Sequence, residues 1–400
     1  MTPNLSRLFP YPFERLAQLK PTSNSVSGKT PIDLSIGEPK HPTPQFIKEE
    51  LINKLDTMGS YPTTRGHDLL RSTICDWLIR RFHLPVETLK AAENILPVNG
   101  TREALFAIAQ CVIDESKSKP CVLFPNPFYQ IYEGAALLAG ADPYYLNCTQ
   151  ENNYLPDFDS VPPDIWARCQ IIYLCSPGNP TGAVLSEKDL IKLMGFSDQY
   201  DFVIASDECY SEIYFDEEHP PTGLLEVAVK SGRTDLRNCL VFHSLSKRSN
   251  VPGLRSGFVA GDKDLINQFL LYRTYHGCSM PLPTQYASIV AWQDEKHVKE
   301  NRQQYREKFD AVVEILSPIL SLEKPEASFY LWPELPLDDV TFACELMKTQ
   351  NVTLLPGSFL ARIADGINPG KNRARIALVA SLEETIEAAY RIKKFINNLN

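Results

Sequence analysis

Short apolar runs that alternate with helical stretches between residues 95 and 260 restrict the fold more than any other feature of this sequence. The runs lie at residues 95–98, 122–124, 170–174, 202–205 and 239–242. They lack the strict alternation of apolar and polar residues that marks a strand with one face in water. Strands covered by helices on both faces have this pattern. The sequence therefore predicts an α/β fold built on a largely parallel sheet.

Polar residues follow several of these runs directly. Asn179, Asp207 and Lys247 each come shortly after a run, and Lys247 is flanked by Ser244 and Ser246. Parallel sheets place their ligand sites beyond the carboxyl ends of the strands. Taken alone, a lysine near serines also fits an exposed loop, and an aspartate there also fits a helix cap. Together these residues predict one site at that end of the sheet.

A further group of residues suits a phosphate and a planar ring. Gly100-Thr101-Arg102 opens a predicted helix, where free N–H groups and the helix dipole favour an anion, although a simple N-terminal cap has the same pattern. Tyr129 either stacks on a ring or is an ordinary exposed aromatic. Asp207 can pair with a protonated ring nitrogen, and we expect Tyr210 on the opening turn of a helix beside it. Further phosphate donors are Ser244, Ser246 and Arg255.

Composition removes several other classes of function. The formal net charge of −9 argues against nucleic acid or an anionic membrane as the main partner. The ten cysteines form no Cys-x-x-Cys pair, so we expect no metal site. Nowhere do eighteen apolar residues run together, and the N-terminal residues do not resemble a signal peptide. We therefore expect a cytoplasmic protein with reduced thiols.

Three motifs in a fixed order resemble the class I/II aminotransferases, which are pyridoxal 5'-phosphate enzymes of fold type I. They are Ser-Pro-Gly-Asn-Pro-Thr-Gly at 176–182, Asp-Glu-Cys-Tyr at 207–210, and Ser-Leu-Ser-Lys at 244–247 followed by Arg255. The resemblance extends from about residue 37 to residue 375. It implies a large domain with a mostly parallel seven-stranded sheet between helices, and a smaller α+β domain.

The resemblance also implies roles in cofactor binding. Lys247 resembles the lysine that forms the internal Schiff base, and Asp207 the partner of the pyridine nitrogen. Asn179 and Tyr210 resemble the residues that bind the ring's 3-oxygen, and Tyr129 resembles the stacking ring. The positions that resemble the phosphate cup are Gly100, Thr101, Arg102, Ser244 and Arg255.

Substrate and subunit contacts follow from the same resemblance. Arg375 resembles the arginine that binds the substrate α-carboxylate, with Arg373 only two residues away. Gly37 and Asn179 resemble residues that lie against the substrate. Tyr61 resembles a residue that reaches the phosphate of the neighbouring subunit, which implies a homodimer with shared sites.

The domain limits that we expect are 1–44 for an N-terminal arm and part of the small domain, 45–284 for the large cofactor-binding domain, and 285–400 for a connecting helix and the C-terminal small domain. Residues 285–316, rich in Glu, Lys and Gln, are expected to form one long helix. Residues 32–36 alternate like a short strand.

A narrower resemblance points to a substrate. Residues 5–16 and 34–44 look like the proteobacterial succinyldiaminopimelate aminotransferases of lysine biosynthesis. That family exchanges an amino group between N-succinyl-L,L-2,6-diaminopimelate and 2-oxoglutarate. Lys40 and Arg65 are candidates for binding a distal carboxylate, or else solvated surface charges.

Other activities are compatible with the same motifs. The alternatives are an aspartate- or aromatic-type aminotransferase and a carbon–sulfur lyase. A transcription regulator with an aminotransferase-like domain is disfavoured, because residues 1–30 are too short and too weakly basic for a DNA-binding module.

Overall fold

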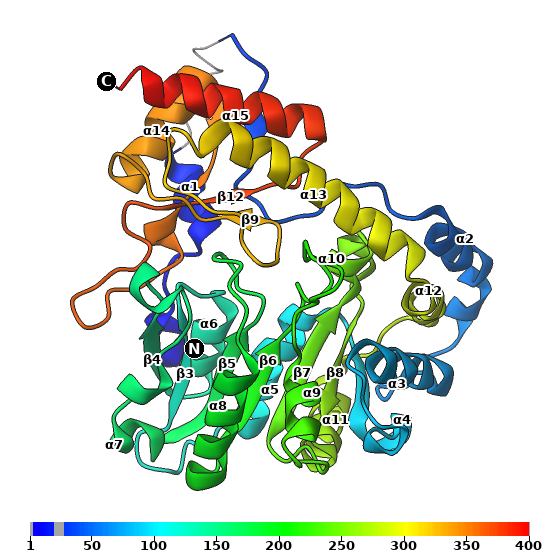
Figure 1. The fold of residues 1–400 in the computed structure, drawn as a ribbon. Coiled ribbons are helices and arrows are strands. Elements are labelled where there is room, and N and C mark those ends of the chain that lie inside the picture. The colour runs from blue at the N-terminus through cyan, green and yellow to red at the C-terminus, as the bar shows by residue number, and fades with distance from the viewer. Residues whose placement is uncertain (1–2, 20–27, 400) are drawn as a thin grey trace.

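A seven-stranded sheet forms the centre of the computed structural model, which describes residues 3–19 and 28–399 (Figure 1). The strand order is β2-β8-β7-β6-β5-β3-β4, and β8 runs antiparallel to both of its neighbours while the remaining pairs are parallel. The α/β fold with a mostly parallel sheet is thereby confirmed. The strands are β2 (Ile95–Val98), β3 (Cys121–Asn126), β4 (Asp142–Asn147), β5 (Cys169–Cys175), β6 (Val203–Asp207), β7 (Cys239–Ser244) and β8 (Gly257–Gly261).

Both faces of this sheet are covered by helices, as the uninterrupted apolar runs require. On β5, Ile172 and Leu174 pack in one hydrophobic core, and Ile171 and Tyr173 pack in the other. The first core also contains residues of α3 (Asp68–Arg81), α8 (Glu187–Tyr200), α9 (Leu224–Lys230) and α12 (Leu282–Gln293). The second contains residues of α5 (Thr101–Val112), α6 (Ile131–Leu138) and α11 (Lys263–His276).

A second unit, here called the C-terminal unit, has its own core above the end of the sheet (Figure 1). This core joins Ile32 and Leu34, from near the start of the chain, to residues between 309 and 396. In its three-stranded sheet, β12 (Ala374–Ala377) lies between β11 (Leu355–Pro356) and β9 (Tyr330–Leu331), and in its two-stranded sheet β1 (Ile32–Asp33) pairs with β10 (Val352–Thr353). Its helices are α13 (Lys296–Leu316), α14 (Asp339–Gln350) and α15 (Leu382–Asn397).

Two expected elements are shorter in the structure. The predicted helix at 285–316 is wrong as one helix, because α12 and α13 are separated at Asp294 and Glu295. Asp294 has extended backbone, which ends α12. Its carboxylate accepts from the backbone N–H of His297 and so caps the first turn of α13. The predicted strand at 32–36 is confined to β1.

We propose that the boundary between the two units lies at 294–295, since a boundary at 284/285 would cut α12 away from its core.

Short helices complete the fold: α1 (Pro12–Leu19), α2 (Gln45–Asn53), α4 (Ala91–Asn94), α7 (Pro163–Trp166) and α10 (Leu245–Arg248). The 3-10 turns are η1 (Pro3–Arg7), η2 (Leu55–Gly59), η3 (Val86–Thr88), η4 (Gln150–Asn152), η5 (Phe158–Ser160), η6 (Pro252–Leu254) and η7 (Gly357–Phe359). Of the helices described, none has the length and apolar character needed to cross a membrane.

Candidate active site

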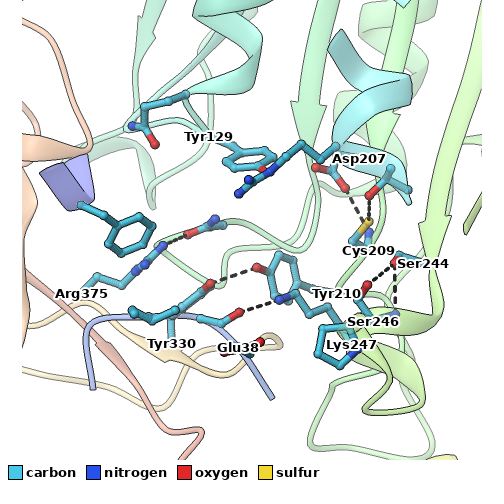
Figure 2. Close-up of a pocket in the computed structure, with 18 of the residues that line it drawn as sticks. Glu38, Tyr129, Asp207, Cys209, Tyr210, Ser244, Ser246, Lys247, Tyr330 and Arg375 are labelled. Atoms are coloured by element: carbon cyan, nitrogen blue, oxygen red, sulfur yellow. Dashed lines mark hydrogen bonds between the residues drawn. The ribbon is translucent and has the colours of Figure 1, made fainter. Parts of the chain in front are cut away.

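A cavity of about 530 Å³ lies between the carboxyl ends of the central strands and the C-terminal unit (Figure 2). Asp207 is the last residue of β6, Ser244 the last of β7, and Asn179 follows β5. The structure thus brings together residues that are separated by many positions in the sequence. The sequence-predicted residues that line it are Gly37, Thr101, Arg102, Tyr129, Asn179, Asp207, Tyr210, Ser244, Ser246, Lys247, Arg255 and Arg375.

Lys247 lies on α10, the short helix that directly follows β7. Ser244 caps this helix, because its hydroxyl accepts from the backbone N–H of Ser246 at 3.1 Å. The Lys247 ammonium donates to the carbonyl oxygen of Gly37 at 2.5 Å and lies 5.2 Å from the centre of the Phe329 ring. Burial is the main cause that lowers the pKa of Lys247 to about 8, and the charge of Arg375 lowers it too. A neutral, nucleophilic amine is therefore accessible close to neutral pH.

Asp207 is a buried carboxylate held by two donors. The hydroxyl of Tyr132 donates to Oδ2 at 2.8 Å, and the backbone N–H of Cys209 donates to Oδ1 at 3.3 Å. Burial raises the pKa of Asp207, and these hydrogen bonds oppose that shift. Within the described part of the chain Asp207 forms no ion pair, so the site offers a buried anion for a cationic ligand atom.

Tyr132 was not among the predicted site residues. Its ring is fully buried and stacked on Tyr173, with ring centroids 4.7 Å apart. The available signal was its position three residues after Tyr129, since Tyr129 lies just before α6 and Tyr132 lies in the first turn of that helix.

The proposed phosphate cup combines a helix N-terminus with serine and arginine side chains. Gly100 has φ of +82° and precedes α5, and a Cβ there would lie 2.1 Å from Nη2 of Arg255. Only glycine lets the Arg255 guanidinium rest against the start of this helix. Ser244 donates from its hydroxyl to that of Ser246 at 2.9 Å. Free N–H groups, hydroxyls and a guanidinium suit a phosphate dianion.

Tyr210 and Tyr330 are joined by a hydrogen bond of 3.0 Å between their hydroxyls. The expectation that Tyr210 opens a helix is wrong, because residues 209–212 form turns. These turns still place Tyr210 in the cavity wall. Tyr330 is on β9, and a Cβ on Gly37 would lie 1.9 Å from its hydroxyl oxygen, so Gly37 has room only for hydrogen.

Arg102 has a side chain that extends across Tyr129. Its Nε donates to the Tyr129 hydroxyl at 2.5 Å, and Nη2 donates to the hydroxyl of Tyr11 at 3.5 Å. Only its backbone N–H therefore belongs to the helix N-terminus at the cup. Tyr11 and Phe13, which the sequence analysis did not select, also line the cavity.

Arg375 and Arg373 differ clearly in their surroundings. Arg375, on β12, is buried, donates from Nη2 to the carbonyl oxygen of Ser35 at 2.7 Å, and lines the cavity. Arg373 donates to the carbonyl oxygen of Trp332 at 3.1 Å and lines a different hollow. The geometry therefore favours Arg375 for a carboxylate in the cavity.

Three other candidates lie outside this cavity. Tyr61 is fully exposed. Lys40 lines a neighbouring hollow of about 520 Å³, and Arg65 lies 3.5 Å from the carboxylate of Asp68 at the surface. A single chain does not bring these side chains to the residues around Lys247.

Residues 29–392 match the family Aminotransferase class I and II. The chain belongs to this family. The aminotransferase is 32% identical to the LL-diaminopimelate aminotransferase of Aquifex aeolicus over 97% of both chains, and 30% identical to that of Desulforudis audaxviator over 97% of this chain and 96% of the relative. These matches confirm the expected pyridoxal-phosphate-dependent enzyme of the class I/II family.

Solved structures of other aminotransferases share the fold. An aminotransferase from Neisseria meningitidis is 46% identical with a TM-score of 0.94, over 99% of this chain and 100% of that chain. A probable N-succinyldiaminopimelate aminotransferase from Thermus thermophilus is 25% identical with a TM-score of 0.85, over 96% of this chain and 99% of that chain. The aminotransferase thus has relatives linked by name to diaminopimelate.

The cavity residues fit pyridoxal phosphate. Asp207 is a buried carboxylate suited to the ring nitrogen, the start of α5 with Arg255 suits the phosphate, and the amine of Lys247 lies in the same cavity. When bound, the cofactor supplies the electron sink for chemistry at the substrate α-carbon.

Proposed function

We propose that this aminotransferase transfers the amino group of N-succinyl-L,L-2,6-diaminopimelate to 2-oxoglutarate in diaminopimelate and lysine biosynthesis. The observation that carries the proposal is the charge of the cavity wall. It contains four cationic side chains and two carboxylates: Arg102, Lys247, Arg255, Arg375, Glu38 and Asp207.

Three of these charges have partners in the bound state that we propose. Arg255 faces the phosphate, Arg375 the α-carboxylate, and Asp207 the ring nitrogen. The guanidinium of Arg102 is then left for the distal end of the donor. In the succinylated donor that end carries two carboxylates, whereas in free diaminopimelate it carries one carboxylate and one ammonium. A unit charge at roughly 6 Å is worth about 2–3 kcal/mol at an effective dielectric constant near 20, so a cation there favours the succinylated donor.

Free L,L-diaminopimelate is the second candidate donor, because the relatives in Aquifex aeolicus and Desulforudis audaxviator are named for it. Glu38, a carboxylate in the cavity wall, would suit its distal ammonium. The two candidates differ only in the group on the distal nitrogen.

A donor panel separates these candidates. The holoenzyme is assayed for glutamate formation from 2-oxoglutarate with the succinylated donor, free L,L-diaminopimelate, aspartate and phenylalanine. We expect kcat/KM for the succinylated donor to exceed that for the free donor by about 10-fold or more. A higher value for free diaminopimelate, aspartate or phenylalanine contradicts the proposal. Release of pyruvate, ammonia and homocysteine from cystathionine would instead support a lyase.

Lys247 is the residue that we propose to hold the cofactor and to carry the proton to and from the substrate α-carbon. Its amine is buried in the cavity, and its depressed pKa supports a base that gains and loses a proton near neutral pH. Replacing Lys247 with Ala should abolish turnover and remove the visible absorbance of the bound cofactor. Persistence of that absorbance would argue against this role.

We also propose a homodimer in which Tyr61 reaches the cup of the partner subunit. The stretch that leads to Tyr61 exposes apolar side chains, because Ile52 and Met58 are each more than 60% exposed. Mixing Tyr61→Ala subunits with Lys247→Ala subunits tests this arrangement. A hybrid dimer regains one intact site if Tyr61 acts across the interface, and regains none if it acts within its own chain.

The cytoplasmic location expected from the sequence stays a prediction.

A further inference from the structure

A buried chain of hydrogen bonds connects Lys308, on α13, to the backbone of Lys247. Lys308 donates from Nζ to Nε2 of His41 at 2.6 Å, and His41 is bonded through Nδ1 to Oδ1 of Asn301 at 2.7 Å. Asn301 then donates from Nδ2 to the carbonyl oxygen of Lys247 at 3.3 Å. Helix α13 extends from the C-terminal unit toward α10, where this chain ends (Figure 1).

One face of α13 carries three residues of this support. Asn301, Tyr305 and Lys308 are four and three residues apart, which places them on the same side of a helix. The Tyr305 ring lies 4.5 Å from that of His41 and 5.6 Å from that of Phe329. Phe329 is in turn the ring beneath the Lys247 ammonium. The side chain and the backbone of Lys247 are therefore both supported from this face.

The partners of His41 determine which of its nitrogens carries the proton. The amide oxygen of Asn301 only accepts, so Nδ1 is protonated, and Nε2 is left to accept from Lys308. Burial lowers the pKa of His41 to about 4, so the ring is neutral in the physiological range. Burial also lowers the pKa of Lys308 to about 8, which keeps it largely protonated at pH 7.

Lys308 is 2% exposed, and in the described ranges it forms no ion pair. Burying an ammonium without a carboxylate is costly, and an apolar side chain of similar size would stabilise the fold better. Among the described residues, the hydrogen-bond partner of the Lys308 ammonium is His41. A role in stability alone does not explain a cation at this place.

His41 lies at the end of the stretch that begins at Gly37. The carbonyl of Gly37 accepts from the Lys247 ammonium, and Glu38 lines the cavity. Two residues after His41, the hydroxyl of Thr43 donates to the carbonyl oxygen of Asn250, so the stretch is fastened beyond His41 as well. We propose that His41, held between Lys308 and Asn301, is a positioning residue that sets the Gly37 carbonyl and Lys247 relative to one another. The proposal rests on the role given above to Lys247.

The test is a double-mutant cycle on the holoenzyme with His41→Phe, Lys308→Met and the two combined. Phe keeps the ring against Tyr305, and Met keeps the length of the lysine stem. Each single substitution should lower kcat by about 10- to 100-fold, while KM for the amino donor changes by less than about 3-fold, because a displaced lysine impairs proton transfer more than binding. The double variant should lose no more than the worse single variant, since both break one chain.

Further measurements separate positioning from stability. If His41 had a structural role only, its substitution would lower the Tm but would leave both the kcat of the folded enzyme and the absorbance maximum of the bound cofactor unchanged. We expect this maximum to shift in His41→Phe. If His41→Phe does not fold, His41→Gln keeps an acceptor for Lys308 and loses the donor to Asn301. The exposed His219 provides the control substitution His219→Phe, which should change neither kcat nor the spectrum.

Single variants with kcat within 2-fold of the wild type, or losses that multiply in the double variant, would overturn the proposal. A wrong assignment of Lys247 as the cofactor lysine would give a different result. Lys247→Ala would then retain turnover or the visible absorbance of the cofactor, whatever the His41 variants do.

Discussion

Arg375 donates a hydrogen bond from Nη1 to Oδ1 of Asn179 at 3.0 Å. These two side chains come from the C-terminal unit and from the loop after β5, and Figure 2 shows the Arg375 end of the cavity opposite Asp207. One is our candidate for the substrate α-carboxylate and the other for the cofactor's ring oxygen. If these two roles hold, we expect a carboxylate that binds Arg375 to act on Asn179 as well, so that substrate binding is coupled to cofactor orientation.

Arg375→Lys should raise KM for every amino donor by about 10- to 100-fold. A lysine keeps the charge but loses the two-pronged contact with a carboxylate, and it cannot reach Ser35 and Asn179 together. Steady-state kinetics with two different donors measure the effect. Arg373→Lys is the matched control and should change KM by less than about 2-fold, since Arg373 does not line the cavity. Equal effects of the two substitutions would contradict the assignment.

Capture of pyridoxal phosphate by the apoenzyme should accelerate as the pH rises through about 8, because the neutral amine of Lys247 is the reactive form. Stopped-flow absorbance measures this rate, and Lys247→Ala should show no such phase.

The lowered pKa of Lys247 also affects the stability of the fold. The folded-state value lies below the ordinary 10.5, so the unfolded chain binds more protons between about pH 8 and 10.5. The contribution of Lys247 to the free energy of unfolding of the apoenzyme therefore rises with pH across that window.

Tyr132→Phe should weaken cofactor binding by about 10-fold. The substitution removes the hydroxyl that donates to Asp207, and a hydrogen bond to a charged group contributes about 1.5–3 kcal/mol. Asp207 then becomes a weaker partner for the ring nitrogen. Equilibrium titration of the apoenzyme with pyridoxal phosphate gives the Kd. Tyr173→Phe is the control, because Tyr173 is equally buried but donates to the carbonyl oxygen of Leu105, and it should lower the Tm without changing the Kd.

Arg102→Gln should reduce kcat/KM for N-succinyl-L,L-diaminopimelate by about 10- to 100-fold more than for free L,L-diaminopimelate. The reason is the loss of the cation that we propose for the distal carboxylates. Lys40→Ala, in the neighbouring hollow, is the control and should affect both donors equally and weakly. Equal losses for the two donors in Arg102→Gln would contradict the proposed contact of this guanidinium with the distal carboxylates.

Residues at strand ends were predictable because their position depends on the local sequence. An apolar run fixes a strand, and the polar residue after it must emerge at the sheet's edge, as Asp207 and Ser244 do. Contacts between distant segments were not predictable in this way. Tyr132 and Asp207 are 75 positions apart, and Tyr210 and Tyr330 are 120 apart, so no local pattern links them. The break between α12 and α13 was missed because it contains no Gly or Pro, and because Asp294 and Glu295 continue into the charged sequence of α13.

The parallel pairing of β1 with β10 determines when the site can be completed. Ile32 pairs with Val352, so the first strand of a newly made chain has no partner until most of the protein has been synthesised. Residues 95–261, which form the central sheet, emerge from the ribosome well before that. The contact of Ser35 with Arg375 can form only after that, because Arg375 lies near the end of the chain. We therefore expect the proposed phosphate cup to form before the proposed substrate site.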